Sequence, residues 1–320
     1  MSLLATPVAQ GGAIDVGTSL AWYRHGRSDP TTRLVTAGRG PGRAGRFERA
    51  THTPDGPGTL TIRWGPAGAD GGERNRSIDV TADGPGGPWL TDRAASMIGA
   101  LDPGCPELGQ ASHPVVAAAA RNHPHLRLGA SGTLYHELLP TVLEQRITAL
   151  EAYRQWALLC RALGDPAPGD HPGLLLPPAP EVLARQPSWW FHPLGIERKR
   201  ANPLIELARH PAKLWEWAEL APAEASAKLR LLPGIGQWTV GVALGPALGD
   251  PDALAVGDLH LKNIVVHALT GAPRGTDEQM LELLDPYRGQ RGRVARLIGL
   301  DGHRAPRFGP KRRLLPMHRW

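Results

Sequence analysis

The chain has 320 residues, of which 41% are apolar and 21% are charged, enough for one large domain or two ordinary ones. No apolar run approaches the roughly 18–20 residues of a membrane-spanning helix, and residues 1–15 lack the features of a signal peptide, so we expect a cytoplasmic protein without membrane contact. The net charge of +6 is concentrated in residues 286–320, where nine arginines and one lysine face the single acid Asp301. This segment is a candidate for binding nucleic acid, and a solvated tail is the alternative.

The cysteine and histidine content argues against a metal centre. Two cysteines, Cys105 and Cys160, are too few for an iron–sulfur cluster held by four thiolates or for a four-cysteine zinc site. The chain has no HExxH motif, and its closest histidines, His123 and His125, flank a proline. We therefore predict no structural metal and no iron–sulfur cluster.

Residues 1–100 are predicted to form a small antiparallel sheet with one or two helices. Four segments rich in Trp, Tyr, Val, Ile and Thr alternate partly between apolar and polar residues, and glycine- and proline-rich turns separate them. A helix is expected over 90–101, where apolar residues recur at helical spacing. The predicted strands are 19–24, 33–37, 59–64 and 77–82.

A GxGxxG motif, formed by Gly40, Gly42 and Gly45, follows the second of these strands. In a dinucleotide-binding fold this motif opens a helix whose N-terminus holds a pyrophosphate. Arginines and a proline surround the glycines here, and no apolar helical pattern follows them. An arginine-rich hairpin loop is therefore the better interpretation.

From residue 113 the pattern becomes helical. Residues 134–163 hold two helical stretches, and a proline-rich connector at 164–180 follows. Further helices are expected over 181–186, 196–209 and 211–220. We therefore predict an α+β protein that consists of an N-terminal sheet domain at 1–110, an all-α domain at 111–302 and a basic C-terminal tail at 303–320.

The most informative segment is 223–269, whose first part predicts two short helices joined by the turn Pro233-Gly234-Ile235-Gly236. Such a turn directs several backbone N–H groups outward at the N-terminus of the second helix, where they can bind a phosphate oxygen. Its glycines allow a close approach of DNA, and Ile235 can anchor the turn inward. Contacts of this kind fix the position of DNA but carry no base-sequence information.

Three motifs in order resemble the helix-hairpin-helix DNA glycosylase superfamily. They are TVLEQRIT at 141–148, LPGIGQWT at 232–239 and VGDLHLKN at 256–263. Among its members the chain is most similar to the bacterial 3-methyladenine DNA glycosylase II type, and the resemblance covers roughly residues 113–300. The resemblance implies an all-α helix-hairpin-helix domain that acts on damaged double-stranded DNA as a monomer.

The resemblance also implies roles for single residues. Asp258 matches the essential catalytic aspartate; an N-cap for a helix over 259–269 is the alternative, and the two roles are compatible. Trp238 stands where members that also cleave the strand carry a nucleophilic lysine, so the chain is expected to remove the base only. In the similar enzymes the matching tryptophan lines the base pocket, to which Leu259 is also assigned here.

Further matching positions are expected at the DNA. Gln145 and Arg146 match the segment that fills the gap left by a flipped nucleotide, although the relative has an apolar wedge at the Arg146 position. Val242, Leu259 and the region of Leu297 lack aromatics that surround the base in the similar enzyme, which leaves the substrate open. The residues expected to contact DNA at the hairpin are Pro233, Gly234, Ile235, Gly236, Gln237 and Thr239.

Taken together, these positions predict a base-excision-repair enzyme that removes alkylated purines such as 3-methyladenine or 7-methylguanine and leaves an abasic site. The chemistry needs no metal or organic cofactor, although the hairpin carbonyls of this family sometimes hold a monovalent cation. Two alternatives stay open. One is a glycosylase for another damaged base, such as an oxidised purine, and the other is a non-catalytic protein that binds particular DNA structures.

Overall fold

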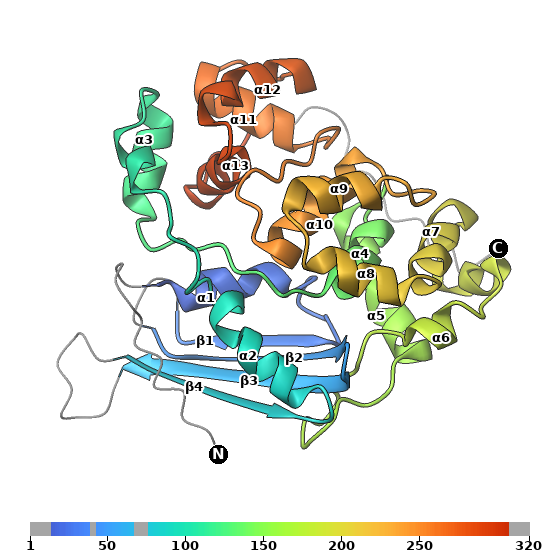
Figure 1. Cartoon of the computed structure of the whole chain (residues 1–320). Helices are drawn as coiled ribbons and strands as arrows, with labels where there is room; N and C mark the ends of the chain where they lie inside the picture. The colour runs from blue at the N-terminus through green and yellow to red at the C-terminus, as the bar shows by residue number, and fades with distance from the viewer. Residues whose placement is uncertain (1–13, 39–42, 67–75, 307–320) are drawn as a thin grey trace.

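The computed structural model describes residues 14–38, 43–66 and 76–306, and it places a small sheet beneath a larger helical part (Figure 1). Four antiparallel strands lie in the order β1-β2-β3-β4. They are β1 (Thr32–Thr36), β2 (Gly45–Thr53), β3 (Gly56–Pro66) and β4 (Arg76–Asp83). The helices beside this sheet are α1 (Val16–Leu20), the 3-10 turn η1 (Ala21–Tyr23) and α2 (Gly87–Met97).

One face of the sheet is buried beneath these helices. Phe47 of β2 pairs with Ile62 of β3, and both side chains are fully buried with Leu20 of α1 and Leu90 of α2. Arg49 lies two residues after Phe47, so it points to the same face, and its Nη2 donates a hydrogen bond of 2.6 Å to Glu137 in the helical part. A buried ion pair thus joins the sheet to the helices.

The helical part contains two further cores. The helices α4 to α10 enclose the larger one, which includes Trp156 and Phe191. The other is formed by α3, α11, α12 and α13 with η2 and η4, and includes Val265 and Met280. The elements are η2 (Pro106–Gln110), α3 (Pro114–Asn122), α4 (Leu134–Leu143), α5 (Ala149–Leu163), α6 (Pro180–Leu183), η3 (Ser188–Leu194), α7 (Arg198–Ala208), α8 (Pro211–Ala218), α9 (Pro222–Leu229), α10 (Gln237–Leu248), α11 (Leu261–Thr270), α12 (Asp277–Leu284), η4 (Asp285–Tyr287) and α13 (Arg291–Leu300).

The predicted fold class, an N-terminal antiparallel sheet followed by helices, is confirmed, and three of the four predicted strands lie in β1, β3 and β4. The strand predicted over 19–24 is wrong, because this segment is helical in α1 and η1. Asp15 caps α1 by accepting a hydrogen bond from the Thr18 N–H, and Leu20 and Tyr23 are buried at helical spacing. The predicted domain boundaries at 110 and 302 stay predictions.

The GxGxxG segment leads into a strand. Gly45 begins β2, whereas Gly40 and Gly42 lie outside the described residues. A Cβ at Gly45 would lie 2.2 Å from the Trp64 ring, so this glycine allows an indole to pack on the backbone. Its presence is therefore explained by packing within the sheet.

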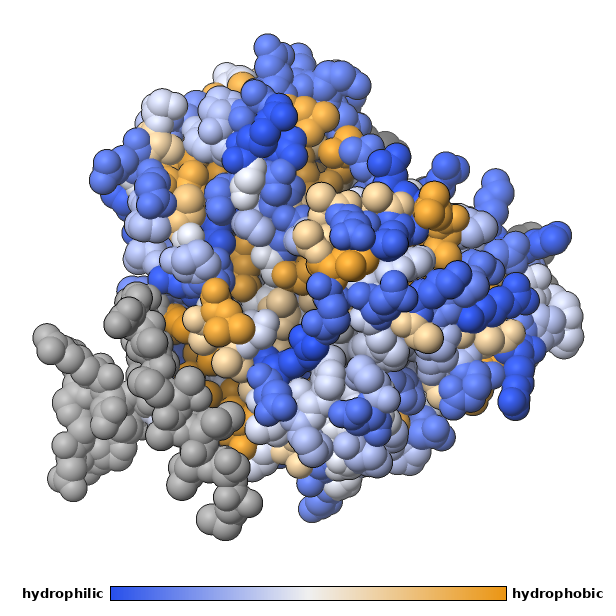
Figure 2. All heavy atoms as spheres, in the orientation of Figure 1, coloured by the Kyte–Doolittle hydropathy of each residue, from blue (hydrophilic) through white to orange (hydrophobic). Residues whose placement is uncertain are grey.

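The surface carries no continuous apolar face in the orientation of Figure 2, where hydrophobic patches over the helices are interrupted by hydrophilic side chains. Within the described ranges, no helix has the length and apolar character needed to cross a membrane.

Candidate nucleic-acid interface and active site

The predicted hairpin is present between α9 and α10. Ile235 is buried and its N–H donates to the Leu232 carbonyl, which closes the turn. Gly234 has φ +84°, and a Cβ there would lie 2.2 Å from Pro203 of α7, so glycine is required for both backbone conformation and packing. The hairpin is therefore seated on α7 as well as on its own two helices.

The N-terminus of α10 is open toward solvent at Gly236. Among the residues that the structure describes, no side chain caps this helix start and a Cβ at Gly236 would meet nothing within 4 Å. Pro233 and Gln237 are exposed on either side of the turn. The first N–H groups of a helix lack intrahelical partners and carry the positive end of its dipole, so this surface is suited to an anion such as a phosphate.

Asp258 lies beside the start of α10. The indole Nε1 of Trp238 donates to Asp258 Oδ2 at 3.0 Å. The N–H groups of His260 and Leu261 both donate to Oδ1 at 2.8 Å. Asp258 therefore holds the beginning of α11 from two residues before its N-cap, which is His260 and not Asp258 as the N-cap alternative predicted, and it stays half-buried beside the indole.

These hydrogen bonds leave the Asp258 carboxylate with a free acceptor position. A carboxylate has about four lone-pair positions. Among the described residues, two donors occupy Oδ1 and one occupies Oδ2. One position on Oδ2 is thus open to a water molecule or to a developing positive charge, and the three N–H groups fix its direction.

The loop before Asp258 is held tightly against α10 and α13. A Cβ at Gly241 of α10 would lie 2.1 Å from the Leu254 carbonyl oxygen, so glycine is needed where this loop crosses the helix. Asp252 accepts hydrogen bonds from the N–H groups of Gly289 and Arg291 and forms an ion pair with the Arg291 guanidinium. Sequence patterns gave no sign of these contacts.

Asp277, at the start of α12, fixes the other end of this loop. Its Oδ1 accepts from the Gly257 N–H at 2.9 Å, and its Oδ2 lies 3.0 Å from Lys262 Nζ. Partial burial alone would raise the pKa of Asp277. The Gly257 N–H and the Lys262 ammonium outweigh this effect and hold that pKa below its usual value. Asp277 was missed by sequence analysis because its partner is a backbone N–H twenty residues away.

The structure brings Gln145 to the hairpin. Its Nε2 donates to the Gly234 carbonyl at 3.0 Å and to Thr239 Oγ1 at 2.9 Å. Arg146 follows with φ +60°, the one non-glycine residue with positive φ in the part of the chain described, and its side chain is exposed. This conformation costs about 1–2 kcal/mol, and the Gln145 contacts hold the turn in it.

Other predicted contact residues have different surroundings. The Thr239 side chain is buried against Gln145, so only its N–H can face an anion. The Leu259 side chain is 71% exposed, and its carbonyl accepts from Asn263 Nδ2. Val242 is half-buried on α10.

Two residues that were not singled out from the sequence form a stacked pair, one member of which reaches α10. Trp22 of η1 contacts α10 at Gly245, and the Arg296 guanidinium lies 3.7 Å above the Trp22 ring.

The prediction that residues 286–320 form one basic binding segment needs correction. Arg288, Arg291 and Arg293 pair with Asp285, Asp252 and Asp102 respectively. Arg296 is held on Trp22 and donates to the Thr18 carbonyl. These arginines are neutralised or stacked within the fold, so DNA contacts from this segment would have to come from residues after 303, of which 307–320 lie outside the described residues.

No group of three or more His, Cys, Asp or Glu side chains suited to a metal ion occurs within residues 14–38, 43–66 and 76–306. The two cysteines are a half-buried Cys105 and a buried Cys160. A monovalent cation at the hairpin stays a prediction.

Comparison with known proteins shows similarity at the level of structure. No family model matches the chain, and no curated protein matches its sequence. The 3-methyladenine DNA glycosylase of Archaeoglobus fulgidus is similar with a TM-score of 0.70 at 18% identity, over 90% of this chain and 95% of that one. The predicted resemblance to helix-hairpin-helix DNA glycosylases is thereby confirmed for the fold.

Two other solved structures share this architecture. The 8-oxoguanine glycosylase/lyase of Clostridium acetobutylicum, in complex with DNA that holds cytosine opposite 8-oxoguanine, has a TM-score of 0.57 at 11% identity, over 84% of this chain and 97% of that one. The 3-methyladenine DNA glycosylase Mag1 of Schizosaccharomyces pombe, in complex with abasic DNA, has a TM-score of 0.50 at 17% identity, over 60% and 93%. The same fold thus occurs in enzymes for alkylated and for oxidised bases.

Proposed function

We propose that this chain is a monofunctional DNA glycosylase that hydrolyses the N-glycosidic bond of alkylated purines, such as 3-methyladenine and 7-methylguanine, and leaves an abasic site. The observation that carries the proposal is the Asp258 carboxylate, fixed by Trp238 next to an open hairpin N-terminus. The fold shared with DNA glycosylases supports the reaction class. The Asp258 carboxylate supports hydrolysis of the glycosidic bond, and Trp238, which offers no nucleophilic amine, supports base removal without strand cleavage.

The first step is binding of the damaged duplex and extrusion of one nucleotide. The open N–H groups at Gly236 and Gln237 would hold a backbone phosphate, and Arg146 would enter the gap in the base stack. Flipping costs a few kcal/mol and is easiest for damaged pairs. Because Gln145 bonds to the hairpin, the phosphate site and the inserting residue are part of one rigid unit.

The second step is cleavage of the bond between sugar and base. As the base departs, positive charge develops on the sugar, and the free acceptor position of Asp258 Oδ2 would stabilise that charge or orient the attacking water. The glycosidic bond breaks with its electron pair going to the base, and the water oxygen forms the new bond at C1′ while its proton passes to the carboxylate.

The proposed substrate class is supported by the chemistry of the site, because no general acid is evident beside Asp258 among the described residues. Purines alkylated at a ring nitrogen are cationic in the nucleoside, so they leave as neutral bases and need little protonation. A cationic base also gains about 0.5–2 kcal/mol when it stacks on an indole, and Trp238 is half-buried beside the carboxylate.

The test is single-turnover base release from duplexes that contain 7-methylguanine, 8-oxoguanine or no damage. We expect release of 7-methylguanine, and Asp258→Asn should lower it by a factor of about 100 or more while duplex affinity changes little. Faster release of 8-oxoguanine would favour the oxidised-purine alternative. DNA binding without release of any base would favour a non-catalytic DNA-binding protein.

A further inference from the structure

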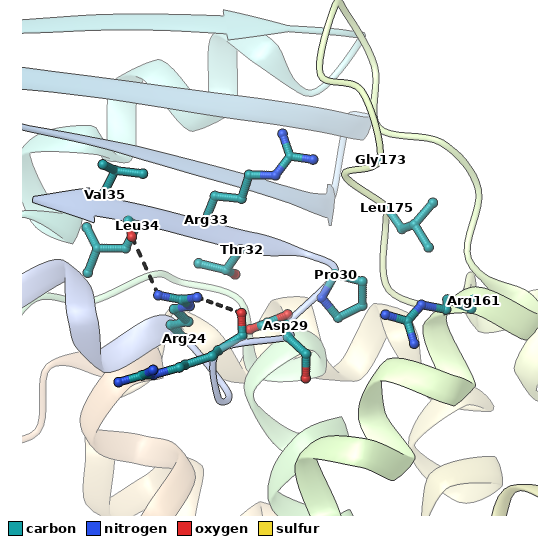
Figure 3. A pocket seen from close by; sticks show the side chains of 12 residues that line it. Arg24, Asp29, Pro30, Thr32, Arg33, Leu34, Val35, Arg161, Gly173 and Leu175 are labelled. Atoms are coloured by element: carbon teal, nitrogen blue, oxygen red, sulfur yellow. Dashed lines mark hydrogen bonds between the residues drawn. The ribbon is translucent and has the colours of Figure 1, made fainter.

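A groove lined by four arginines lies between the edge of the sheet and α5. It has a volume of about 300 Å³ and runs along β1. Arg24, Arg33 and Arg161 border it from three different segments of the chain (Figure 3). Arg27 completes the set, which we call the arginine groove. Nothing in the proposed base-excision chemistry uses it.

The positive charge of the arginine groove is not compensated within the fold. Arg27 and Arg161 are exposed, and neither has an acidic group within 4 Å among the residues that the structure describes. Arg24 donates only to the carbonyls of Leu34 and Arg27, and its buried Nε has no partner there. A desolvated guanidinium donor without an acceptor is costly, so this arrangement favours an anion.

The acidic residue of the groove, Asp29, offsets at most one of the four arginine charges, and no ion pair joins it to these arginines among the described residues. Its Oδ1 accepts from the Thr31 N–H, the Thr31 hydroxyl and the Trp156 indole, and its Oδ2 accepts from the His25 N–H. Arg33 approaches an acid only at 4.0 Å, from Glu48. The groove therefore presents net positive charge to solvent.

The arginine groove is connected to the turn that carries Gln145 and Arg146. His25, which lies between Arg24 and Arg27, has Nδ1 3.5 Å from Glu144 Oε1, next to that turn. From there α5 extends to Arg161 in its last turn, a distance of about 18 Å at 1.5 Å per residue. One end of the groove, where Arg24 and Arg27 flank His25, therefore lies beside the inserting turn, and the other end, at Arg161, lies at the far end of α5.

Resting on the proposed function, we infer that the Arg161 end of the arginine groove binds backbone phosphates of the same duplex, about five base pairs from the flipped nucleotide. Duplex DNA rises 3.4 Å per base pair, so the 18 Å along α5 corresponds to roughly that many steps. Arginine suits this role because its planar guanidinium binds phosphate oxygens in pairs. The groove would extend the hold on DNA from the hairpin to the N-terminal sheet without reading base sequence.

The test is binding of the full chain to two duplexes of about 24 base pairs with an abasic analogue placed near one end or near the other. In each duplex about three base pairs lie on the short side of the analogue, so only one of the two duplexes reaches the Arg161 end of the groove. With that duplex, Arg33→Gln/Arg161→Gln, at the end of the groove next to the connector after α5, should weaken binding about three- to tenfold and reduce the salt slope of log affinity by about one to two. With the other duplex the double variant should bind as the unmodified chain does.

The matched control is Arg63→Gln/Arg185→Gln, which removes the same charge at two exposed arginines outside the groove. The inference is overturned if the groove and control variants have the same duplex affinity and salt slope. It is also overturned if the groove variant loses the same fraction of its affinity for both duplexes. Groove-dependent binding of inorganic triphosphate, with duplex affinity unchanged, would reveal a small-anion site and would overturn it too. If the unmodified chain binds neither duplex, the proposed function itself fails.

Discussion

The indole Nε1 of Trp238 donates a hydrogen bond of 3.0 Å to Oδ2 of Asp258, the carboxylate oxygen that retains an open acceptor position. The resemblance to helix-hairpin-helix DNA glycosylases predicts that this indole stands where strand-cleaving members carry a nucleophilic lysine; in this structure it donates to the carboxylate. A residue at the start of α10 and a residue before α11 thereby become one functional unit.

Trp238→Phe keeps an aromatic ring but removes this donor. Because a hydrogen bond to a charged group contributes about 1.5–3 kcal/mol, we expect base release to fall about ten- to a hundredfold. Affinity for an abasic duplex should change little, so the loss appears in the single-turnover rate and in its pH profile. Trp215→Phe, in a tryptophan that packs on Trp89, is the control. An unchanged rate and profile would mean that Trp238 only stacks on the base.

The chain should not form a covalent intermediate with DNA. Position 238 offers no amine, and the Lys262 ammonium is held 3.0 Å from Asp277. Incubation with damaged duplex and borohydride should therefore give no cross-linked product and no cleaved strand. A cross-link that disappears in Lys262→Gln would identify that lysine as a nucleophile and contradict the monofunctional assignment.

Gly236→Ala should separate DNA binding from folding. The new Cβ meets no protein atom within 4 Å and the backbone has φ −97°, so the melting temperature should stay close to that of the unmodified chain. The same methyl group would occupy the space through which a phosphate approaches the α10 N–H groups, so duplex affinity should fall at least about tenfold. Gly299→Ala, which also projects a methyl group into open space, should alter neither property. Unchanged affinity of Gly236→Ala would remove the hairpin from the interface.

Removal of residues 307–320 tests whether the basic tail binds DNA, without removing the arginines that form ion pairs within the fold. It takes away four arginines and one lysine, whereas Arg288, Arg291 and Arg293 keep their partners. If all five charges contact phosphates, the slope of log affinity against log salt should decrease by about 4–5. We expect a decrease toward this value; an unaltered slope would show that the tail does not contact DNA.

His25 should make stability depend on pH in the alkaline range. Burial alone would lower the pKa of His25, but the carboxylates of Glu137 and Glu144 raise it from 6.5 to about 9, with Asp29 adding to the effect. The folded pKa thus exceeds the unfolded one, so the stabilisation is fully present below pH 6.5 and is lost as the pH rises through 9. Its size is of the order of 3 kcal/mol.

The measurement for His25 is the free energy of unfolding in urea at pH 6, 7.5 and 9.5. The unmodified chain should lose stability across this range, and His25→Gln should lose much less. Because the nearby Arg49 remains charged throughout, it does not contribute to the difference. Parallel curves for the two proteins would contradict the assigned role of His25.

The sequence alone determined the parts of the site that depend on local backbone. Pro233-Gly234-Ile235-Gly236 predicts its own turn because Gly234 must adopt positive φ and Ile235 must point inward, and the structure agrees. Asp258 was identified through the resemblance of VGDLHLKN to the aspartate segment of a known family, and it accepts hydrogen bonds from N–H groups of the next few residues. Turn chemistry and helix periodicity are encoded within a few residues, so they can be recognised without a fold.

Only the tertiary structure decided which distant groups hold the site in place and which charges stay free. Asp102 neutralises Arg293 from 191 residues away, and Asp277 reaches the Gly257 N–H from another helix. The segment at 19–24 shows the same limit within the sheet domain, because burial of Leu20 and Tyr23 at helical spacing overrides its strand-like composition. Partners of this kind meet only after the chain packs, so no local pattern records them.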